Sequence, residues 1–230
     1  MDQNVSIAAL PPWNVDQPPP VPVRRFSVDE YHRLGEIGVL TEDDRVELLE
    51  GWIVPKMVHN PPHDGTIELL DEALRQILPS GWRIRIQSSI TTDDSEPEPD
   101  LAIVRGTVRS FLSRHPGPDE VGLLIEVADS SLSRDRNTKA RLYGRAGIPV
   151  YWIINLTDRQ LELFTDPTGP DPSPGYRQQR TFGPDDEIPF ELDGNEMATR
   201  WHVSPFGNFF RGILYVTPIT WRDYWPPPKE

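Results

Sequence analysis

Two carboxylates in apolar surroundings are the residues of this sequence that most directly suggest chemistry. Glu126 lies within the largely apolar run 121–128, and Asp100 opens a second apolar segment 26 residues earlier. A carboxylate in a buried strand is costly unless it is paired or binds a metal. Two carboxylates at adjacent strand ends can share a hard cation such as Mg²⁺ or Mn²⁺. The alternatives are an ion pair of Glu126 with an arginine and a turn role for Asp100 after Pro99.

Lys139 is the third residue for which we predict a chemical role. It lies 13 residues beyond Glu126, on a helix predicted to follow that strand. Because such a helix returns across the sheet, Lys139 can point back toward the strand ends. There it would orient an attacking water and offset charge on a phosphoryl transition state. The alternative is an ordinary solvated helix lysine.

The segment that carries Lys139 is basic within an acidic chain. Residues 134–145 contain five basic residues and one acid, Asp135, whereas the whole chain has a formal net charge of −13. A DNA backbone needs such a local positive field. The arginines assigned to DNA binding are Arg134, Arg136, Arg141 and Arg145. The alternative is a solvated helix face balanced by acids elsewhere, such as Asp93 and Asp94.

Hydrophobic periodicity places these residues in an α/β fold. Helices are predicted from Ser27 to Gly35 or Gly38, over 64–78 and over 134–146. Strands are predicted over 45–49, 52–57, 82–90, 100–104, 121–128 and 150–155, with weaker candidates at 161–164, 176–182 and 188–192. This order indicates a mixed β-sheet with helices on its faces.

Composition limits the class of protein. The chain has no cysteine, which excludes disulfides and cysteine-ligated metal sites and fits a cytoplasmic setting. No apolar stretch reaches the roughly 18 residues needed to span a membrane, and the N-terminus lacks a signal-peptide pattern, so we expect no membrane partner.

The ends of the chain differ in composition from its middle. Residues 1–25 are expected to form a proline-rich arm, residues 26–194 one compact domain and residues 195–230 an aromatic-rich tail. So many aromatic side chains predict a homodimer contact or docking on the core. A poorly ordered terminus is the alternative.

Six short sequence blocks of this chain match blocks of a known protein family and occur in the same order. They are residues 44–51, 95–101, 124–132, 135–139, 142–143 and 146–153. In these blocks the chain resembles the Uma-two family of prokaryotic endonucleases, within the PD-(D/E)xK nuclease superfamily. The resemblance implies a restriction-endonuclease-like core over residues 26–194, with a mixed β-sheet flanked by helices.

The resemblance also assigns roles to particular residues. It implies that Asp100 and Glu126 are metal ligands. Separately from the resemblance, we predict the Val127 carbonyl as a third ligand of the same cation. The superfamily usually places its lysine two residues after the second acid, where this chain has Ala128. The family supplies that lysine from the next helix, which corresponds here to Lys139.

Two further residues match family positions. Glu47 corresponds to an acidic position and would be an additional ligand or a group that orients water, with an exposed strand carboxylate as the alternative. His63 precedes the second predicted helix, where the family often has a histidine. It could contact phosphate, but helix capping or simple packing is the favoured role.

Three functions fit these residues. The first is an Mg²⁺- or Mn²⁺-dependent endonuclease that hydrolyses DNA phosphodiester bonds. The second is a catalytically inactive interaction protein that keeps the nuclease fold, which the net charge and the aromatic tail would suit. The third is an RNA-directed or exonucleolytic enzyme, because the same site could serve it.

Overall fold

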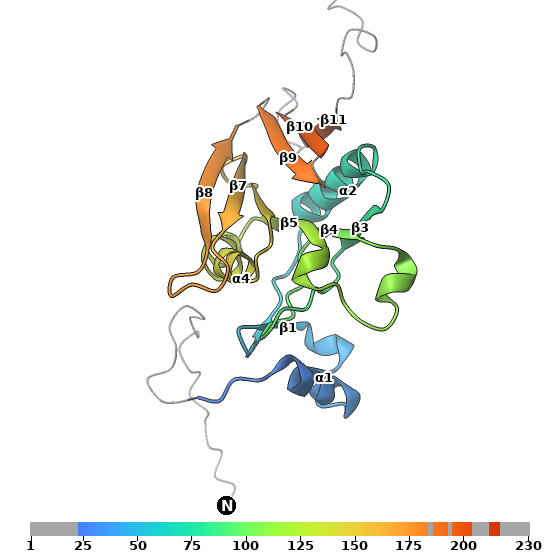
Figure 1. The fold of residues 1–230 in the computed structure, drawn as a ribbon, viewed down its shortest axis with the longest axis vertical. Coiled ribbons are helices and arrows are strands. Elements are labelled where there is room, and N and C mark those ends of the chain that lie inside the picture. The colour runs from blue at the N-terminus through green and yellow to red at the C-terminus, as the bar shows by residue number, and fades with distance from the viewer. Residues whose placement is uncertain (1–22, 184–185, 193–194, 204–211, 217–230) are drawn as a thin grey trace, which may run out of the picture.

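The computed structural model describes residues 23–183, 186–192, 195–203 and 212–216, so nearly all of the expected N-terminal arm lies outside these ranges (Figure 1). Helix α1 (Val28–Glu36) begins where the capping-box spacing predicted. The Glu30 N–H donates to the Ser27 hydroxyl at 3.2 Å, and the Ser27 N–H donates to the Glu30 carboxylate at 3.0 Å. A short 3₁₀ turn, η1 (Glu42–Asp44), follows.

A two-stranded hairpin comes next, as the sequence predicted. Strands β1 (Val46–Leu49) and β2 (Trp52–Pro55) are antiparallel. Glu50 and Gly51 form the turn with φ values of 49° and 78°, which suits a type I′ turn. A Cβ on Gly51 would lie 2.5 Å from the Cβ of Arg25, so this position also requires glycine for space.

Six strands form the central sheet in the order β3-β4-β5-β6-β7-β8 (Figure 1). Their bounds are β3 (Trp82–Ile86), β4 (Leu101–Arg105), β5 (Val121–Ala128), β6 (Val150–Asn155), β7 (Gln160–Pro167) and β8 (Tyr176–Phe182). Only β5 and β6 are parallel neighbours within this sheet. Parallel neighbours need a crossover connection, and the helical segment between them supplies it. The mixed sheet confirms the predicted fold class.

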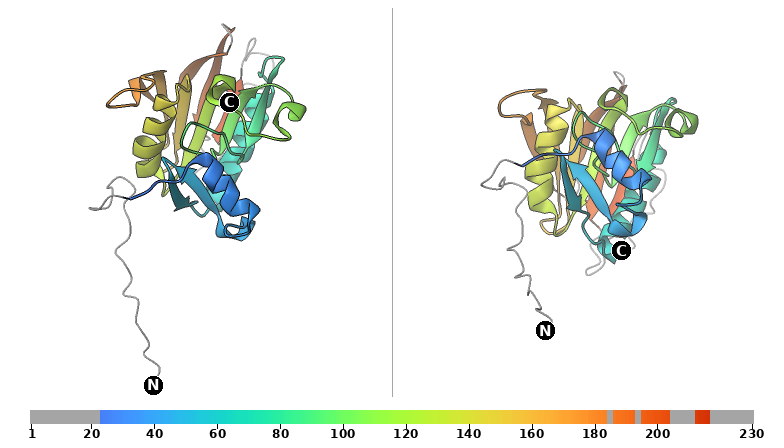
Figure 2. Two further views of the ribbon diagram at one scale, coloured as in Figure 1. Left: turned by 60° about the horizontal axis from the view of Figure 1, so that its bottom comes forward. Right: turned by 90° about the horizontal axis from the view of Figure 1, so that it is seen from below.

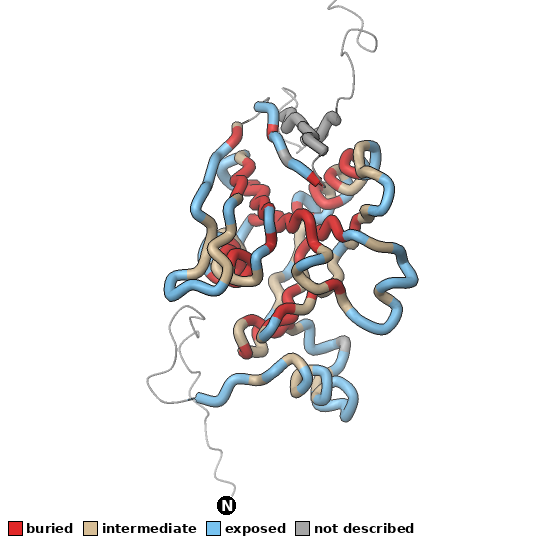
Figure 3. The backbone as a smooth tube through the Cα atoms, viewed as in Figure 1, coloured by how far each residue is buried: buried red, intermediate tan, exposed pale blue. Residues whose placement is uncertain are grey.

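Strand β5 lies at the centre of the molecule. All eight of its residues are buried (Figure 3), as predicted for a strand that is covered on both faces. Two 3₁₀ turns, η2 (Val108–Phe111) and η3 (Pro118–Glu120), connect β4 to β5.

Helices cover the sheet from both sides (Figure 2). Helix α2 (Pro61–Arg75) packs its apolar stripe on one face. The other face is covered by the hairpin and by a helical segment made of α3 (Leu132–Arg134), a π-helical turn η4 (Asp135–Lys139) and α4 (Ala140–Arg145). No helix in the described ranges is long and apolar enough to cross a membrane.

Regular structure continues past residue 195, where an aperiodic tail was expected. Strands β9 (Glu187–Leu192), β10 (Asn195–Val203) and β11 (Gly212–Val216) form a second antiparallel sheet in the order β11-β10-β9. Strand β11 lies against helix α2. The remainder of the expected tail, residues 204–211 and 217–230, lies outside the described residues.

Candidate functional site

A cavity of about 60 Å³ opens where β4 and β5 meet the helical segment that follows β5. The hairpin and the first residues of α2 complete its walls. Seven of the residues singled out in the sequence line it: Glu47, His63, Asp100, Glu126, Val127, Arg134 and Lys139. Residues that are far apart in the chain therefore converge on one site.

Asp100 stands immediately before β4 and faces the backbone of β5. Its Oδ2 atom accepts a hydrogen bond from the Val127 N–H at 2.8 Å, and Nε2 of His63 lies 3.3 Å from the same oxygen. Burial alone would raise the pKa of Asp100. The hydrogen bond and charge of His63, with the Val127 N–H, outweigh burial and hold that pKa below its usual value. Asp100 is therefore kept as an anion.

Glu126 and Lys139 form a buried pair in the same cavity. The Lys139 Nζ donates to Glu126 Oε1 at 2.8 Å, and the Tyr143 hydroxyl donates to the same oxygen at 2.8 Å. Burial raises the pKa of Glu126 well above its usual value, and the positive charge of Lys139 opposes that shift. Burial also tends to lower the pKa of Lys139, but the negative charges of Glu126 and Glu47 outweigh it and keep this lysine protonated.

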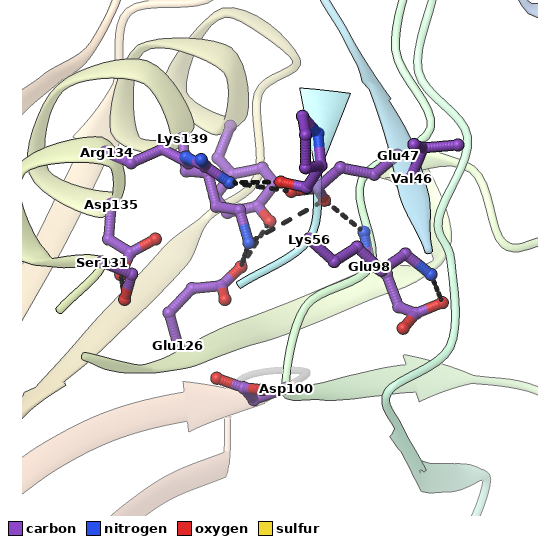
Figure 4. Close-up of polar contacts among 12 residues, drawn as sticks. Val46, Glu47, Lys56, Glu98, Asp100, Glu126, Ser131, Arg134, Asp135 and Lys139 are labelled. Carbon is purple, nitrogen blue, oxygen red and sulfur yellow. Dashed lines mark hydrogen bonds and ion pairs between the residues drawn. The ribbon is translucent and has the colours of Figure 1, made fainter. Parts of the chain in front are cut away.

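Glu47 approaches the pair from the hairpin (Figure 4). Its Oε2 atom lies 4.0 Å from the Lys139 Nζ and accepts a hydrogen bond from the Glu98 N–H at 3.1 Å. Arg134 lies 3.9 Å from its other oxygen and donates to the Pro55 carbonyl at 3.0 Å. Glu47 is only 4% exposed, so it belongs to the cavity and not to an open strand surface.

Asp135 is a fourth buried carboxylate in this cavity, and no role was predicted for it from the sequence. It lies in the π-helical turn, where the Ser131 hydroxyl donates to its Oδ2 atom at 2.6 Å. Burial raises the pKa of Asp135. The four-residue spacing from Lys139 was the available signal, because residues so spaced share a helix face. Tyr143 lies four residues beyond Lys139, so the same spacing also indicates Tyr143.

The chain is similar to known proteins. A family model described as "Putative restriction endonuclease" and named Uma2 matches residues 28–198. The chain belongs to the Uma2 family. This membership confirms the resemblance seen in the sequence and supports a nuclease.

A solved structure shares the Uma2 domain's fold. It is described as a "putative nuclease belonging to DUF820 from Anabaena variabilis ATCC 29413", and it is 17% identical with a TM-score of 0.50. The match covers 72% of this chain and 89% of that one. No curated protein matches the chain.

Three of the four arginines assigned to DNA lie outside the Uma2 cavity, in ion pairs. Arg136 donates to Glu162 at 2.6 and 2.9 Å. Arg141 donates to Glu50 at 2.7 Å, and Arg145 donates to Asp94 at 2.6 Å. Asp94 is one of the acids named in the alternative interpretation. Only Arg134 lines the cavity.

Histidines at the start of α2 form a further group at the Uma2 cavity. The rings of His59 and His63 stack with centroids 4.3 Å apart. Together with Asp64 they offer ligand atoms that all lie within 4.8 Å of one another, a spacing that could hold a metal ion. The His63 N–H also donates to the Asn60 side chain at 3.1 Å, which caps α2. His63 thus links the helix start to Asp100.

Proposed function

We propose that this chain is an Mg²⁺- or Mn²⁺-dependent endonuclease that hydrolyses phosphodiester bonds in DNA. The observation that carries the proposal is the convergence of Asp100, Glu126 and Lys139 on one cavity, with Lys139 2.8 Å from Glu126. Stability alone does not explain two buried carboxylates beside one protonated lysine. The free energy needed to remove such charges from water about equals the free energy gained from their attraction.

The donor set suits a hard divalent cation. Asp100 and Glu126 offer carboxylate oxygens, and we assign the Val127 carbonyl as the third protein ligand. Oxygen ligands of this kind favour Mg²⁺ or Mn²⁺. A cation bound there supplies Lewis-acid stabilisation of the phosphoryl oxygens.

The chain's own residues have separable roles in this proposal. Lys139, which is protonated, stabilises the negative charge that develops on the phosphoryl group and orients water. Tyr143 and His63 are positioning residues that hold Glu126 and Asp100, respectively. Glu47 is an additional ligand or orients the attacking water, because it faces Lys139 from the hairpin. Arg134 contacts substrate phosphate at the rim of the cavity.

A second candidate is a catalytically inactive interaction protein with the nuclease fold. Two observations favour it. The chain carries a net charge of −13. All four candidate DNA-binding arginines already lie in ion pairs with acids, the pair of Arg134 with Glu47 being the longest at 3.9 Å. RNA-directed or exonucleolytic cleavage is a variant of the first proposal.

A cleavage assay with metal control tests the proposal. Supercoiled DNA, linear DNA and RNA would each be incubated with purified protein in Mg²⁺, in Mn²⁺ and in excess chelator. We expect cleavage of supercoiled DNA that needs the cation. Cleavage of RNA or of linear ends alone would redirect the substrate assignment. Failure to cut any substrate in either cation, with the protein folded, would favour the interaction protein.

A further inference from the structure

The edge strand of the central sheet carries two arginines for which the described residues supply no acid. Arg83 and Arg85 lie two residues apart on β3, so both side chains project from the same face. Neither makes an ion pair or a side-chain hydrogen bond with any residue in the described ranges, and both Nε atoms are buried without a hydrogen-bond partner. Other arginines of the chain donate to carboxylates, as Arg114 does to Glu120 at 2.6 Å.

The segments around this pair contain no acid at all. Residues 81–92 and 101–117 hold five arginines and no Asp or Glu, in a chain of net charge −13. Strands β3 and β4 pair along their length, so the two segments adjoin in space. The ring of Phe111 supports the arrangement, since the guanidinium carbons of Arg85 and Arg114 lie 5.5 and 5.3 Å from its centre.

The electrostatics of Arg85 fit a position that lacks a counterion. Burial, and next the charge of Arg83, lower the pKa of Arg85. Two like charges held together without an acid are unfavourable, and an anion between them would relieve the repulsion. Phosphate suits such a site, because two parallel N–H donors of a guanidinium group match two of its oxygens.

The arginine pair lies on the same face of the sheet as the proposed catalytic carboxylate. Arg85 is paired with Ala102 across the β3–β4 ladder, and Ala102 is paired with Leu124 across the β4–β5 ladder. Directly opposite residues point to the same face, and so do residues two apart on one strand. Glu126, two residues beyond Leu124, therefore shares this face with Arg85.

The separation between them suits a nucleic-acid duplex. From the spacing of strands and the rise per residue, the backbone positions of Arg85 and Glu126 are about 12 Å apart. The major groove of DNA is about 12 Å wide, so a single duplex can reach both places. Strand β3 also leads directly into Gln87, which lines the cavity.

We propose that Arg83 and Arg85 bind backbone phosphates of the nucleic acid whose scissile bond lies at the cavity. The identity of this ligand rests on the proposed nuclease function. Phosphate contacts set the position of a duplex without reading its sequence. The β3 edge therefore fixes where the substrate backbone lies relative to Asp100, Glu126 and Lys139.

Salt-dependent binding of a short labelled DNA duplex tests this surface. Fluorescence anisotropy would be measured with Ca²⁺ in place of Mg²⁺, and intact DNA would be verified on a gel. Arg83→Ala with Arg85→Ala should weaken binding at least tenfold and flatten the plot of log affinity against log salt by about two units. The matched control is Arg177→Ala with Arg180→Ala on β8, the opposite edge strand, which removes the same charge and should leave the slope unchanged.

A second pair of substitutions separates charge from packing on Phe111. Arg83→Lys with Arg85→Lys keeps both positive charges and should retain a slope close to that of the wild type. An unchanged slope in the alanine variant, an equal loss in the β8 control or no binding by the wild type would each overturn the proposal.

Cleavage and binding outcomes distinguish this surface from the nuclease function itself. If the wild type cleaves DNA with metal but the alanine variant keeps the wild-type salt slope, the proposed phosphate-binding surface alone is refuted. If the alanine variant has a flatter salt slope but the wild type cleaves no DNA, hydrolysis alone is refuted.

Charged residues on an edge strand can also prevent pairing between molecules. A larger mass of the alanine variant by light scattering, with an unchanged slope, would assign the arginines to that role instead.

Discussion

At the scale of single residues, the site depends on what holds two buried carboxylates in place. The sequence could single out Asp100 and Glu126, because each is a carboxylate beside or within an apolar run, and Lys139 through its place on the helix predicted after Glu126. It could not pair them with His63 or Tyr143, since such hydrogen bonds depend on how distant segments pack. The assignment of Arg141 and Arg145 to DNA rested on local charge, and the acids that face them come from elsewhere in the chain.

The hydroxyl of Tyr143 gives the first prediction. It donates to Glu126 Oε1 at 2.8 Å in the core, and Tyr143→Phe removes this donor at nearly constant volume. We expect the free energy of unfolding to fall by about 1–3 kcal/mol and metal-dependent cleavage to slow several-fold. Urea unfolding and initial rates would measure the two effects.

Tyr176 provides the matched control for that change. Its hydroxyl is buried without a hydrogen-bond partner among the described residues, so Tyr176→Phe should leave stability unchanged or slightly raised. Equal losses in the two variants would show that the bond to Glu126 is not responsible.

At the scale of elements, strong local patterns predicted the central strands well. The apolar runs gave the bounds of β5 and β6 as the structure has them. Helix α2 begins at Pro61, earlier than expected, because Asn60 caps it and proline fits the first helical position. Strand β3 ends at Ile86 because Gln87 adopts a φ of 43° and turns the chain. The π-helical turn has no signature in periodicity.

Gly144 in α4 gives a prediction about helix packing. A Cβ at this position would lie 2.2 Å from the carbonyl oxygen of Gly175. Gly144→Ala should therefore lower the free energy of unfolding by about 1–3 kcal/mol, although alanine is the better helix former. Gly35→Ala in α1 is the control, since nothing lies within 4 Å of its Cβ position. Thermal unfolding that finds Gly144→Ala as stable as wild type would contradict this packing.

Glu50 links the hairpin to α4 and gives a pH-dependent prediction. Burial would raise its pKa, but the hydrogen bond and charge of Arg141 and the charge of Arg145 hold it below the usual value of 4.5. Its contribution to stability is therefore complete above that pH and is lost as the pH falls through the lower folded-state pKa. Glu50→Gln should cost about 1 kcal/mol at neutral pH.

The pH profile of this loss is the diagnostic measurement. The difference between wild type and Glu50→Gln, followed by urea unfolding, should shrink below pH 4.5. Glu36→Gln, in the exposed pair with Arg33, should show almost no difference at any pH. A constant deficit for Glu50→Gln across the range would contradict the ion-pair explanation.

At the scale of the whole molecule, the order of elements predicted a mixed sheet but not the order of its strands. The parallel pair β5–β6 follows from the helical crossover between them, whereas the positions of β3 and β8 at the edges come from antiparallel pairings with no local signal. Strands β10 and β11 were missed for the same reason. The homodimer expected from the aromatic residues beyond 195 stays a prediction.

Deletion of residues 193–230 tests the role of that region. It removes the strand paired with β9 and the strand against α2. We expect the free energy of unfolding to fall by more than about 2 kcal/mol, roughly the effect of exposing one large apolar side chain. Light scattering on the same samples tests the homodimer. If the deleted region forms the dimer contact, the truncated protein should have about half the molecular mass of the full-length dimer. Unchanged stability and mass together would assign the region no structural role.

Two groups of residues at the cavity could hold a catalytic cation, and one comparison separates them. Asp100 belongs to the carboxylate set with Glu126, whereas Asp64 belongs to the group with His59 and His63. The decisive measurement is the initial rate of Mg²⁺-dependent DNA cleavage by Asp100→Asn and by Asp64→Asn. Hydrolysis at Asp100, Glu126 and Lys139 predicts a loss of at least about 100-fold for Asp100→Asn and a change of only a few fold for Asp64→Asn. A wild-type rate in folded Asp100→Asn would contradict it.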